Sequence, residues 1–414
     1  MEKIVYFIII GLLVFDFVLE RFLDYLNTTR WSETLPDEVK GIYDEKKYRK
    51  QQAYEKTNHR FSMLTGSFSF IMVLLMFLLY GFAFVDRLAH EISASPVVVA
   101  LVFFGILMLA SDLLTTPFDI YHTFSIEERF GFNKTTPKTY IFDKLKGWLL
   151  GAVIGGGILA LVVFIYLKTT TLFWIYVWLV ISVFSIFMAM FYSNLIVPLF
   201  NKQTPLEDGE LKQAISGFAK KVGFKLDNIF VIDGSKRSTK SNAYFTGLGA
   251  KKRIVLYDTL INDLKTDELV AVLAHEIGHY KKRHIISSLV LGILQTGLML
   301  YIFSLLVNSP ALSGALGVAQ PSFHIGLVAF GVLYSPLSDI IGIGMNLFSR
   351  KNEYEADAFA AKNYNADSLA SALKKLSVKN LSNLRPHPAY VFFNYSHPTL
   401  LQRLAALEKI SEKK

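Results

Sequence analysis

The residues best suited to chemistry in this chain are His-Glu-Ile-Gly-His at 275–279. On a helix, a separation of four residues places His275 and His279 on one face, where both imidazoles can bind one Zn²⁺. Glu276 then lies beside the metal and can take a proton from an attacking water. This pattern is typical of zinc metalloproteases. A helix with two histidines and no metal is the alternative, but the chain has only nine His in 414 residues, so a chance match is rare.

A catalytic zinc site of this kind needs a third protein ligand and keeps one position open for water. The segment 349–361 has a helical pattern in which Glu353 and Asp357 lie four residues apart on one face. We expect Glu353 to bind the metal and Asp357 to accept the second N–H of a ligating histidine, which fixes the tautomer. A solvated acidic helix face is the alternative. Glu355 lies off this face, so we predict that it is a surface residue.

Composition predicts a membrane protein, because 52% hydrophobic residues and a mean hydropathy of +0.37 are too apolar for an ordinary soluble enzyme of this length. Runs long enough to cross about 30 Å of hydrocarbon predict seven transmembrane helices. The first run continues into charged residues without a small-residue cleavage site, so we expect an uncleaved helix. The runs lie near 4–19, 61–85, 96–114, 148–167, 173–197, 286–306 and 323–347.

The distribution of lysine and arginine predicts the orientation. The loops 20–60 and 115–147 are rich in these residues, whereas the loop 307–322 has none. The basic side is expected to be cytoplasmic, which places the N-terminus outside and both halves of the zinc site at the cytoplasmic face. The net charge of +9 is then mainly a topology signal with some attraction to anionic lipid, and no nucleic-acid partner is expected. Because the chain has no cysteine, it has neither a disulfide framework nor a thiol nucleophile.

Four segments describe the expected organisation: 1–197 with membrane helices one to five and two basic loops, 198–285 with the first part of a metalloprotease domain, 286–347 with helices six and seven, and 348–414 with the second part and the third ligand. In the second segment we expect an amphipathic helix through about 222, a strand from 228, and a β-hairpin over 242–257 with its turn at 247–252. An exposed strand beside the metal could pair with an extended peptide. A strand that only stabilises the sheet is the alternative.

With these motifs in place, the chain resembles the type I CAAX prenyl proteases, which are integral-membrane zinc metalloproteases. The His-Glu-x-x-His pattern alone would not select this family, but the order of several segments together with seven spans does. The matching segments are 125–135, 198–202, 205–211, 241–245, 252–256, 275–279, 353–357 and 396–403.

The resemblance implies a mainly α integral membrane protein, in which seven helices form a barrel around a water-filled chamber. A zincin-like α+β metalloprotease domain would close the cytoplasmic end, with one Zn²⁺ per chain held by His275, His279 and Glu353. Asn242 and Ala243 match the substrate-pairing strand of the family, and His397 and Arg403 match residues that line the cleft near the metal. For His397 we expect a catalytic donor to the oxyanion. A structural histidine before Pro398 is the alternative.

The expected function is therefore zinc-dependent endoproteolysis in the membrane, with Glu276 as the base. The resemblance implies substrates that carry a prenylated C-terminal Cys-aliphatic-aliphatic-any motif and are cut after the cysteine. Broader quality-control proteolysis of membrane proteins is the main alternative, and a site-2-type intramembrane protease or a non-catalytic transporter are others. The location would be the inner membrane of a bacterium, or the endoplasmic reticulum or inner nuclear membrane of a eukaryote. His122, His284 and His324 are predicted to be interfacial or structural rather than metal ligands.

Overall fold

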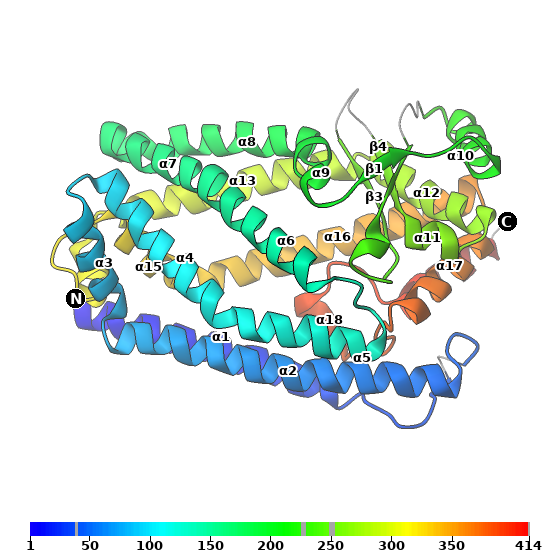
Figure 1. Cartoon of the computed structure of the whole chain (residues 1–414), viewed down its shortest axis with the longest axis horizontal. Coiled ribbons are helices and arrows are strands. Elements are labelled where there is room, and N and C mark those ends of the chain that lie inside the picture. Colours follow the sequence, from blue (N-terminus) through cyan, green and yellow to red (C-terminus); the bar gives the residue numbers. More distant parts are fainter. Residues whose placement is uncertain (38–39, 225–228, 248–252, 413–414) are drawn as a thin grey trace.

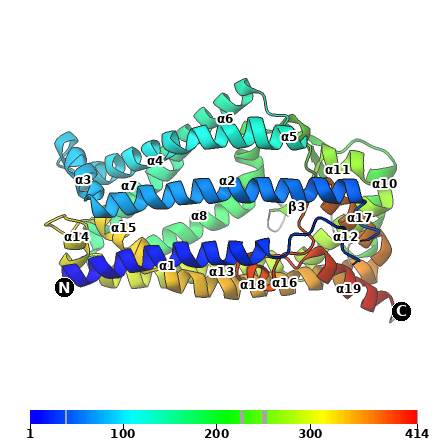
Figure 2. The same cartoon turned by 90° about the horizontal axis from the view of Figure 1, so that it is seen from below.

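The fold is given by a computed structural model, which describes residues 1–37, 40–224, 229–247 and 253–412. Long helices run along the molecule, and a small sheet lies at one end beside α10 (Glu210–Lys221), α11 (Asp258–Asp263) and α12 (Thr266–Lys281) (Figure 1). The N-terminus lies at the opposite end, and the C-terminus lies at the end that carries the sheet (Figures 1 and 2). The architecture is therefore mainly helical with one small sheet, as predicted.

Five continuous helical segments are long and apolar enough to cross a membrane among the described residues. They are α2 (Glu45–Leu78), α4 (Pro96–Tyr121) with η2 (His122–Glu127) and α5 (Glu128–Phe130), α6 (Pro137–Leu150) with η3 (Gly151–Gly155) and α7 (Gly156–Thr169), α8 (Phe173–Leu195) with α9 (Val197–Phe200), and α13 (His284–Leu306). A sixth forms if α15 (Phe323–Leu333) and α16 (Ser335–Asn363), bent by 58°, count as one span.

The first predicted span, 4–19, falls on α1 (Glu2–Thr28), which is 27 residues long. Asp16, Glu20 and Arg21 interrupt its apolar sequence, so it is not among the helices above. α1 nevertheless packs in the helical bundle, because Ile9 is fully buried in a cluster with Phe103 and Ile325. The count of seven spans, the chamber and the orientation remain predictions.

Two predicted spans differ from the structure in their boundaries. The run 61–85 passes the end of α2, because Tyr80 adopts a left-handed backbone (φ 53°) and α3 (Gly81–Ile92) starts a new direction. The run 323–347 is broken between α15 and α16, where Pro336 lies in the first turn of α16. Proline has no N–H to donate to the preceding turn, and its ring clashes with that turn, so a helix that reaches Pro336 changes direction there.

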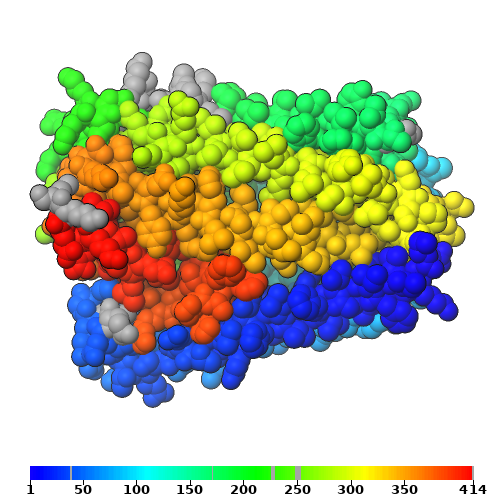
Figure 3. Space-filling view, turned by 180° about the vertical axis from the view of Figure 1, so that it is seen from behind, coloured from blue at the N-terminus to red at the C-terminus, as the bar shows by residue number. Residues whose placement is uncertain are grey.

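Neighbouring spans pack through apolar side chains and one close approach. Phe173 of α8 and Phe303 of α13 are buried in the same cluster. A side chain at Gly297 would lie 2.9 Å from the Trp178 ring nitrogen, so only glycine allows α13 to lie this close to α8. Figure 3 shows α13, α16 and α1 along one face, and blue-green atoms of deeper helices are visible through narrow gaps between them.

The sheet has four strands in the order β1-β2-β4-β3. β1 (Gln203–Pro205) pairs antiparallel with β2 (Ile229–Ile232), β2 pairs parallel with β4 (Arg253–Tyr257), and β3 (Ala243–Thr246) pairs antiparallel with β4. β4 is central and fully buried at 254–256, whereas β3 is an edge strand. The predicted hairpin is present with Ala243 opposite Leu256. Residues 248–252 of the predicted turn at 247–252 lie outside the described residues, as does the predicted strand start at 228.

The two expected parts of the protease domain share one hydrophobic core. One buried cluster joins five helices of these two parts. The first part contributes Ile215 of α10 (Glu210–Lys221) and Leu273 of α12 (Thr266–Lys281). The second part contributes Ala360 of α16, Leu369 of α17 (Ala366–Lys379) and Leu407 of α19 (Leu400–Ser411). Segments more than 80 residues apart in the sequence therefore fold together around α12. The remaining helical elements are η4 (Thr170–Leu172), η5 (Gly234–Lys236), α11 (Asp258–Asp263), α14 (Pro310–Ala315) and α18 (Pro388–Asn394).

Candidate active site

The start of α12 is fixed by a buried carboxylate. Glu268 accepts a hydrogen bond from the Lys265 backbone N–H at 2.8 Å, from Ser371 at 2.7 Å and from Lys375 at 2.7 Å. Burial would raise the pKa of the Glu268 carboxyl, but the bonds from Lys375, Ser371 and the backbone outweigh it and lower the pKa. The ionised carboxylate thus ties the first turn of α12 to α17.

Small residues bring α12 close to α16. A side chain at Gly278 would lie 3.1 Å from the Ala356 Cα and 3.2 Å from its carbonyl oxygen. Ala356 is itself fully buried. Because the two backbones approach this closely, side chains one turn away on each helix can meet at a common point.

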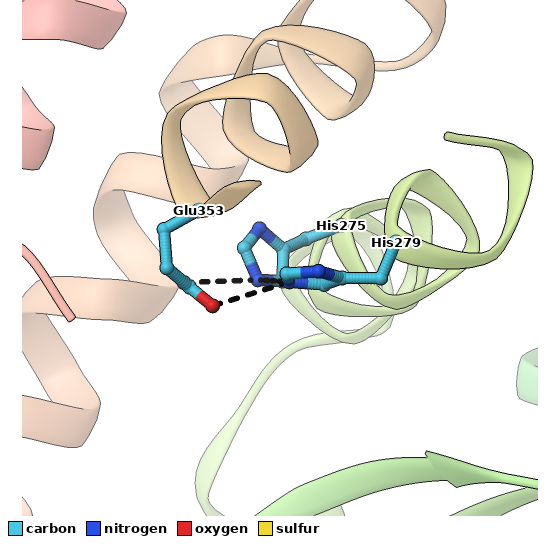
Figure 4. Close-up of side chains that lie close together, drawn as sticks. All are labelled: His275, His279 and Glu353. Atoms are coloured by element: carbon cyan, nitrogen blue, oxygen red, sulfur yellow. Dashed lines mark hydrogen bonds and ion pairs between the residues drawn. The ribbon is translucent and has the colours of Figure 1, made fainter. Parts of the chain in front are cut away.

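Three candidate ligands meet between these helices. His275 Nε2 lies 3.1 Å from His279 Nε2. Glu353 Oε1 lies 3.2 Å from His279 Nε2, and Glu353 Oε2 lies 3.5 Å from His275 Nε2. Figure 4 shows the Glu353 carboxylate of α16 directed at both rings of α12. One donor atom from each of the three residues lies within 4.8 Å of the other two, which is the compactness that one metal ion requires.

The chemistry of this cluster fits a metal better than it fits a structural ion pair. The Glu353 side chain is 6% exposed, and its Oε2 has no hydrogen-bond partner in the part of the chain that the structure describes. A buried carboxylate oxygen without a hydrogen-bond partner is costly. A cation between the three groups would satisfy all of them, and two imidazoles with one carboxylate are a typical donor set for catalytic zinc.

His275 is oriented from behind by a charged pair. Its Nδ1 lies 2.8 Å from Asp357 Oδ1, as expected for a carboxylate that accepts the second N–H of a ligating histidine. Burial disfavours the charged ring, but hydrogen bonds to Asp357 and Glu353 outweigh it and raise the pKa of His275 to about 9. A proton and a metal therefore compete for Nε2, so metal binding weakens as the pH falls.

Arg403 has partners other than those expected. It was predicted to line the cleft and bind substrate, but its side chain is 13% exposed and donates to both Asp357 oxygens, Nε at 2.8 Å and Nη2 at 2.6 Å. Its Nη1 lies 3.6 Å from Glu353 Oε2. The guanidinium thus faces the carboxylates behind the ligands, which suits the orientation of Asp357 rather than contact with a peptide.

His279 has a second relay that the sequence analysis missed. His279 Nδ1 lies 3.1 Å from His284 Nδ1, and His284 Nε2 lies 3.2 Å from Glu355 Oε2. The tautomer that frees His279 Nε2 for a metal has Nδ1–H donating to His284, which in turn donates to Glu355. His284 was predicted to be interfacial or structural and Glu355 to be a surface residue, and neither prediction included this contact with the candidate ligand His279. The histidine five positions after His279 was the available sequence signal.

The left-handed residue between α12 and α13 places His284 in this relay. Arg283 has φ 59°, so the chain turns sharply and α13 begins at His284. The turn brings His284 back beside the last turn of α12, where its side chain is buried. A regular continuation of α12 would carry His284 to another face, because five residues on a helix advance the direction by about 140° beyond one turn.

Two further groups with predicted catalytic roles lie at the cluster. Burial raises the pKa of the Glu276 carboxyl, and the neighbouring His275 and His279 oppose that shift. His397 lies before α19, with Nε2 3.3 Å from Glu353 Oε1 and Nδ1 2.9 Å from Ser396 Oγ. Its side chain is 61% exposed, so it approaches the cluster from the open side.

The edge strand β3 leaves one side of its backbone free. The Asn242 carbonyl accepts a hydrogen bond from the Tyr257 backbone N–H at 3.1 Å, so the backbone groups of Asn242 are directed at β4. In an antiparallel pair the backbone groups of alternate residues point in opposite directions. The N–H and C=O of Ala243 therefore face away from β4, and the N–H donates to the Asn242 side-chain oxygen at 2.8 Å.

The comparisons with known proteins agree with this architecture. Residues 24–202 match the family model described as the CAAX prenyl protease N-terminal region with five membrane helices, and residues 205–411 match peptidase family M48. The CAAX prenyl protease 1 of Saccharomyces cerevisiae is 38% identical over 98% of this chain and 96% of its own length. The Arabidopsis thaliana homologue is 37% identical (97% and 96%), and the human homologue is 32% identical (91% and 89%).

A solved structure gives the same result in three dimensions. The crystal structure of S. mikatae Ste24p superposes with a TM-score of 0.93 at 38% sequence identity and covers 98% of this chain and 99% of that one. The similarity thus extends over the membrane helices as well as the protease unit. The chain belongs to peptidase family M48, among the membrane metalloproteases of the CAAX prenyl protease type.

Proposed function

We propose that this protein is a zinc endopeptidase that cuts prenylated proteins after the cysteine of a C-terminal CAAX motif and releases a tripeptide. The observation that carries the proposal is the compact His275, His279 and Glu353 cluster in a chain of this family. The relatives above are named CAAX prenyl proteases, and the chain covers nearly their full length.

We assign His275, His279 and Glu353 as the zinc ligands, one ion per chain. Bound zinc supplies a Lewis acid that makes an attacking water more acidic and polarises the scissile carbonyl. Asp357 with Arg403 holds the His275 ring, and His284 with Glu355 holds the His279 ring. Both ligands are thus fixed in the tautomer that presents Nε2.

Glu276 and His397 are the groups proposed to act on the substrate. Glu276 takes the proton of the attacking water and delivers it to the leaving amine, a role for which a carboxyl with a raised pKa is suited. His397 donates from the open side of the cluster to the oxyanion that forms on the carbonyl.

The edge of β3 is proposed to align the substrate. Ala243 presents an N–H and a C=O away from the sheet, and an extended peptide could continue the sheet there, with the Asn242 side chain moving aside. β3 also packs against α12, which carries the two histidines. Backbone pairing would hold the peptide at a fixed distance from the cluster while tolerating different side chains.

The other candidate functions fit the structure less well. A site-2-type protease carries its His-Glu-x-x-His pattern within an apolar span, whereas α12 is buried in the core of the protease unit. A non-catalytic transporter has no need of a complete ligand set with two relays. Broader proteolysis of membrane proteins remains the second candidate, because backbone pairing does not select side chains.

The location is part of the same proposal. With α1 as the first of seven spans and the basic loops inside, the cluster faces the cytoplasm. The compartment would be the endoplasmic reticulum or inner nuclear membrane in a eukaryote, or the inner membrane in a bacterium. The partners are then the bilayer and a peptide or protein substrate, with no nucleic acid.

A peptide panel tests the substrate class. Peptides that end in a CAAX motif are incubated with purified protein, with and without a farnesyl group on the cysteine, and the products are identified by mass spectrometry. We expect cleavage after the cysteine and a higher kcat/KM for the farnesylated peptide. Equal cleavage of both forms at many internal bonds would instead support the broader endoprotease.

A further inference from the structure

A groove on the surface of the protease unit gathers positive charge from two separate parts of the chain. Its volume is about 570 Å³, within the range of small-molecule sites. Lys47 and Lys50 line it from the first turns of α2, and Lys374, Lys375 and Lys379 line it from the last turns of α17. Asp263 is the one carboxylate in the lining, as far as the described residues show.

The spacing on α17 directs its side chains to the groove. Four lining residues of α17 follow one another at intervals of three, one and three residues, so they share one face of the helix. They are Ser371, Lys374, Lys375 and Val378. Across the groove, the Lys50 ammonium reaches the left-handed turn at Gly131, to within 4.0 Å of the position a side chain would take there. The groove is thus built from segments that are more than 300 residues apart in the sequence.

Three of the five lysines have carboxylate partners. Lys375 lies 2.7 Å from Glu268, Lys379 lies 3.1 Å from Asp263, and Lys47 lies 3.7 Å from Asp44. Neither Lys50 nor Lys374 forms an ion pair with a residue that the structure describes. The five lysines therefore have three carboxylate partners between them, and the two lysines without such a partner come from different helices, α2 and α17.

A solvated lysine face is the ordinary explanation for exposed lysines. Here, however, the charges come from two separate helices and line one groove, together with the apolar Phe132 and Val378. Like charges that line one groove repel, and an anion between them would relieve the repulsion. We infer that the groove is a binding site for a phosphate-rich anion, with Lys50 and Lys374 as its main contacts.

The position of the groove along α2 favours a soluble anion over a lipid headgroup. α2 carries charged residues as far as Arg60 and none from Phe61 to Leu78, so the hydrocarbon begins no earlier than Phe61. Lys50 lies 11 residues before Phe61, which is about 16 Å along a helix. The headgroup layer is only about 5–8 Å thick, so a lipid phosphate would lie below the groove.

Binding of tripolyphosphate to the purified full-length protein tests this inference. Isothermal titration compares the parental protein, the Lys50→Gln/Lys374→Gln variant and a control variant, Lys220→Gln/Lys409→Gln, which loses the same charge at exposed positions of α10 and α19. We expect the groove variant to bind at least tenfold more weakly than the parental and control proteins, and the affinity to fall with added salt. Zinc content is measured after each titration, since tripolyphosphate also binds zinc.

Two parallel arms identify the source of the anion. Vesicles that contain phosphatidylinositol 4,5-bisphosphate and an oligoglutamate peptide are tested against the same three proteins. If the parental protein bound only to the vesicles, and the groove variant did not bind them, the anion would still be a phosphate. The inference that its source is soluble would then be overturned. Tighter binding of oligoglutamate than of tripolyphosphate would assign the groove to an acidic protein segment and overturn the inference. Equal tripolyphosphate affinity in the groove and control variants would overturn it as well.

Discussion

Replacing Asp357 by asparagine should weaken zinc binding while leaving the fold intact. Asp357 Oδ1 lies 2.8 Å from His275 Nδ1 and accepts from Arg403 Nη2 at 2.6 Å, and Oδ2 accepts from Arg403 Nε at 2.8 Å. An asparagine has one oxygen and one NH₂ in the same space. If the asparagine oxygen stays with His275, its NH₂ faces the Arg403 Nε–H, and two donors then oppose each other. If the amide is rotated by 180°, the NH₂ faces His275 Nδ1–H, and the histidine loses its acceptor.

The magnitude follows from the role of such partners. Losing the outer hydrogen-bond partner of a ligating histidine typically costs about 10–100-fold in metal affinity. That range is about 1.4–2.7 kcal/mol of binding free energy. Zinc affinity of the parental and Asp357→Asn proteins is measured by competition with a chromophoric chelator, and circular dichroism checks that the helices remain.

A control separates this effect from a general loss of charge. Asp367→Asn makes the same change at an exposed position in the first turn of α17 and should keep parental zinc affinity. If the folded Asp357→Asn protein binds zinc within twofold of the parental protein, Asp357 does not orient His275 and the reasoning is refuted.

Three further outcomes are expected. Ala243→Pro should lower kcat/KM roughly ten- to a hundredfold with normal zinc content, because it removes an outward N–H from β3 while the ladder to β4 stays complete. A membrane-impermeant thiol probe applied outside sealed cells should label Gln320→Cys and spare Lys220→Cys, both exposed positions in a chain without cysteine. Glu268→Gln should lower stability by about 1–3 kcal/mol at pH 7. Since the folded pKa of Glu268 is lowered, this difference should be present above about pH 5 and disappear as the pH falls through the folded pKa, as thermal unfolding at several pH values would show.

Each of these outcomes has a matched control and a contrary result. Ala243→Ser keeps the N–H and should retain activity, and an Ala243→Pro protein with the parental rate would make β3 merely structural. Labelling of Lys220→Cys with protection of Gln320→Cys would reverse the orientation. Glu408→Gln, exposed on α19, should leave stability unchanged. A constant difference between the Glu268→Gln and parental proteins down to pH 3 would rule out the charged capping contact.

Local patterns predicted the parts of the site that lie on one helix. The spacing of His275 and His279, and of Glu353 and Asp357, determines which side chains share a helix face, so each pair follows from helix geometry alone. The need for a third ligand predicted that Glu353 meets the two histidines, and the resemblance implied the same set. In the structure that contact between the helices depends on Gly278, which permits the close approach of α12 and α16.

The partners that depend on tertiary contacts were not predictable in this way. His284 follows a left-handed residue at Arg283, and neither the turn nor its contact with His279 leaves a periodic signal in the sequence. Glu355 lies off the face that Glu353 and Asp357 share on α16, and it contacts His284 of α13. The resemblance placed Arg403 in the cleft, whereas in the structure its donors are directed at Asp357.

The turnover of zinc-loaded Glu276→Gln protein tests the central claim most directly. Glutamine keeps the size of the side chain but cannot take a proton from the attacking water. We predict that the variant retains one zinc per chain and cleaves a farnesylated CAAX peptide about 10²–10⁴-fold more slowly than the parental protein. A folded, zinc-loaded Glu276→Gln protein that cleaves this peptide at close to the parental rate would contradict the account.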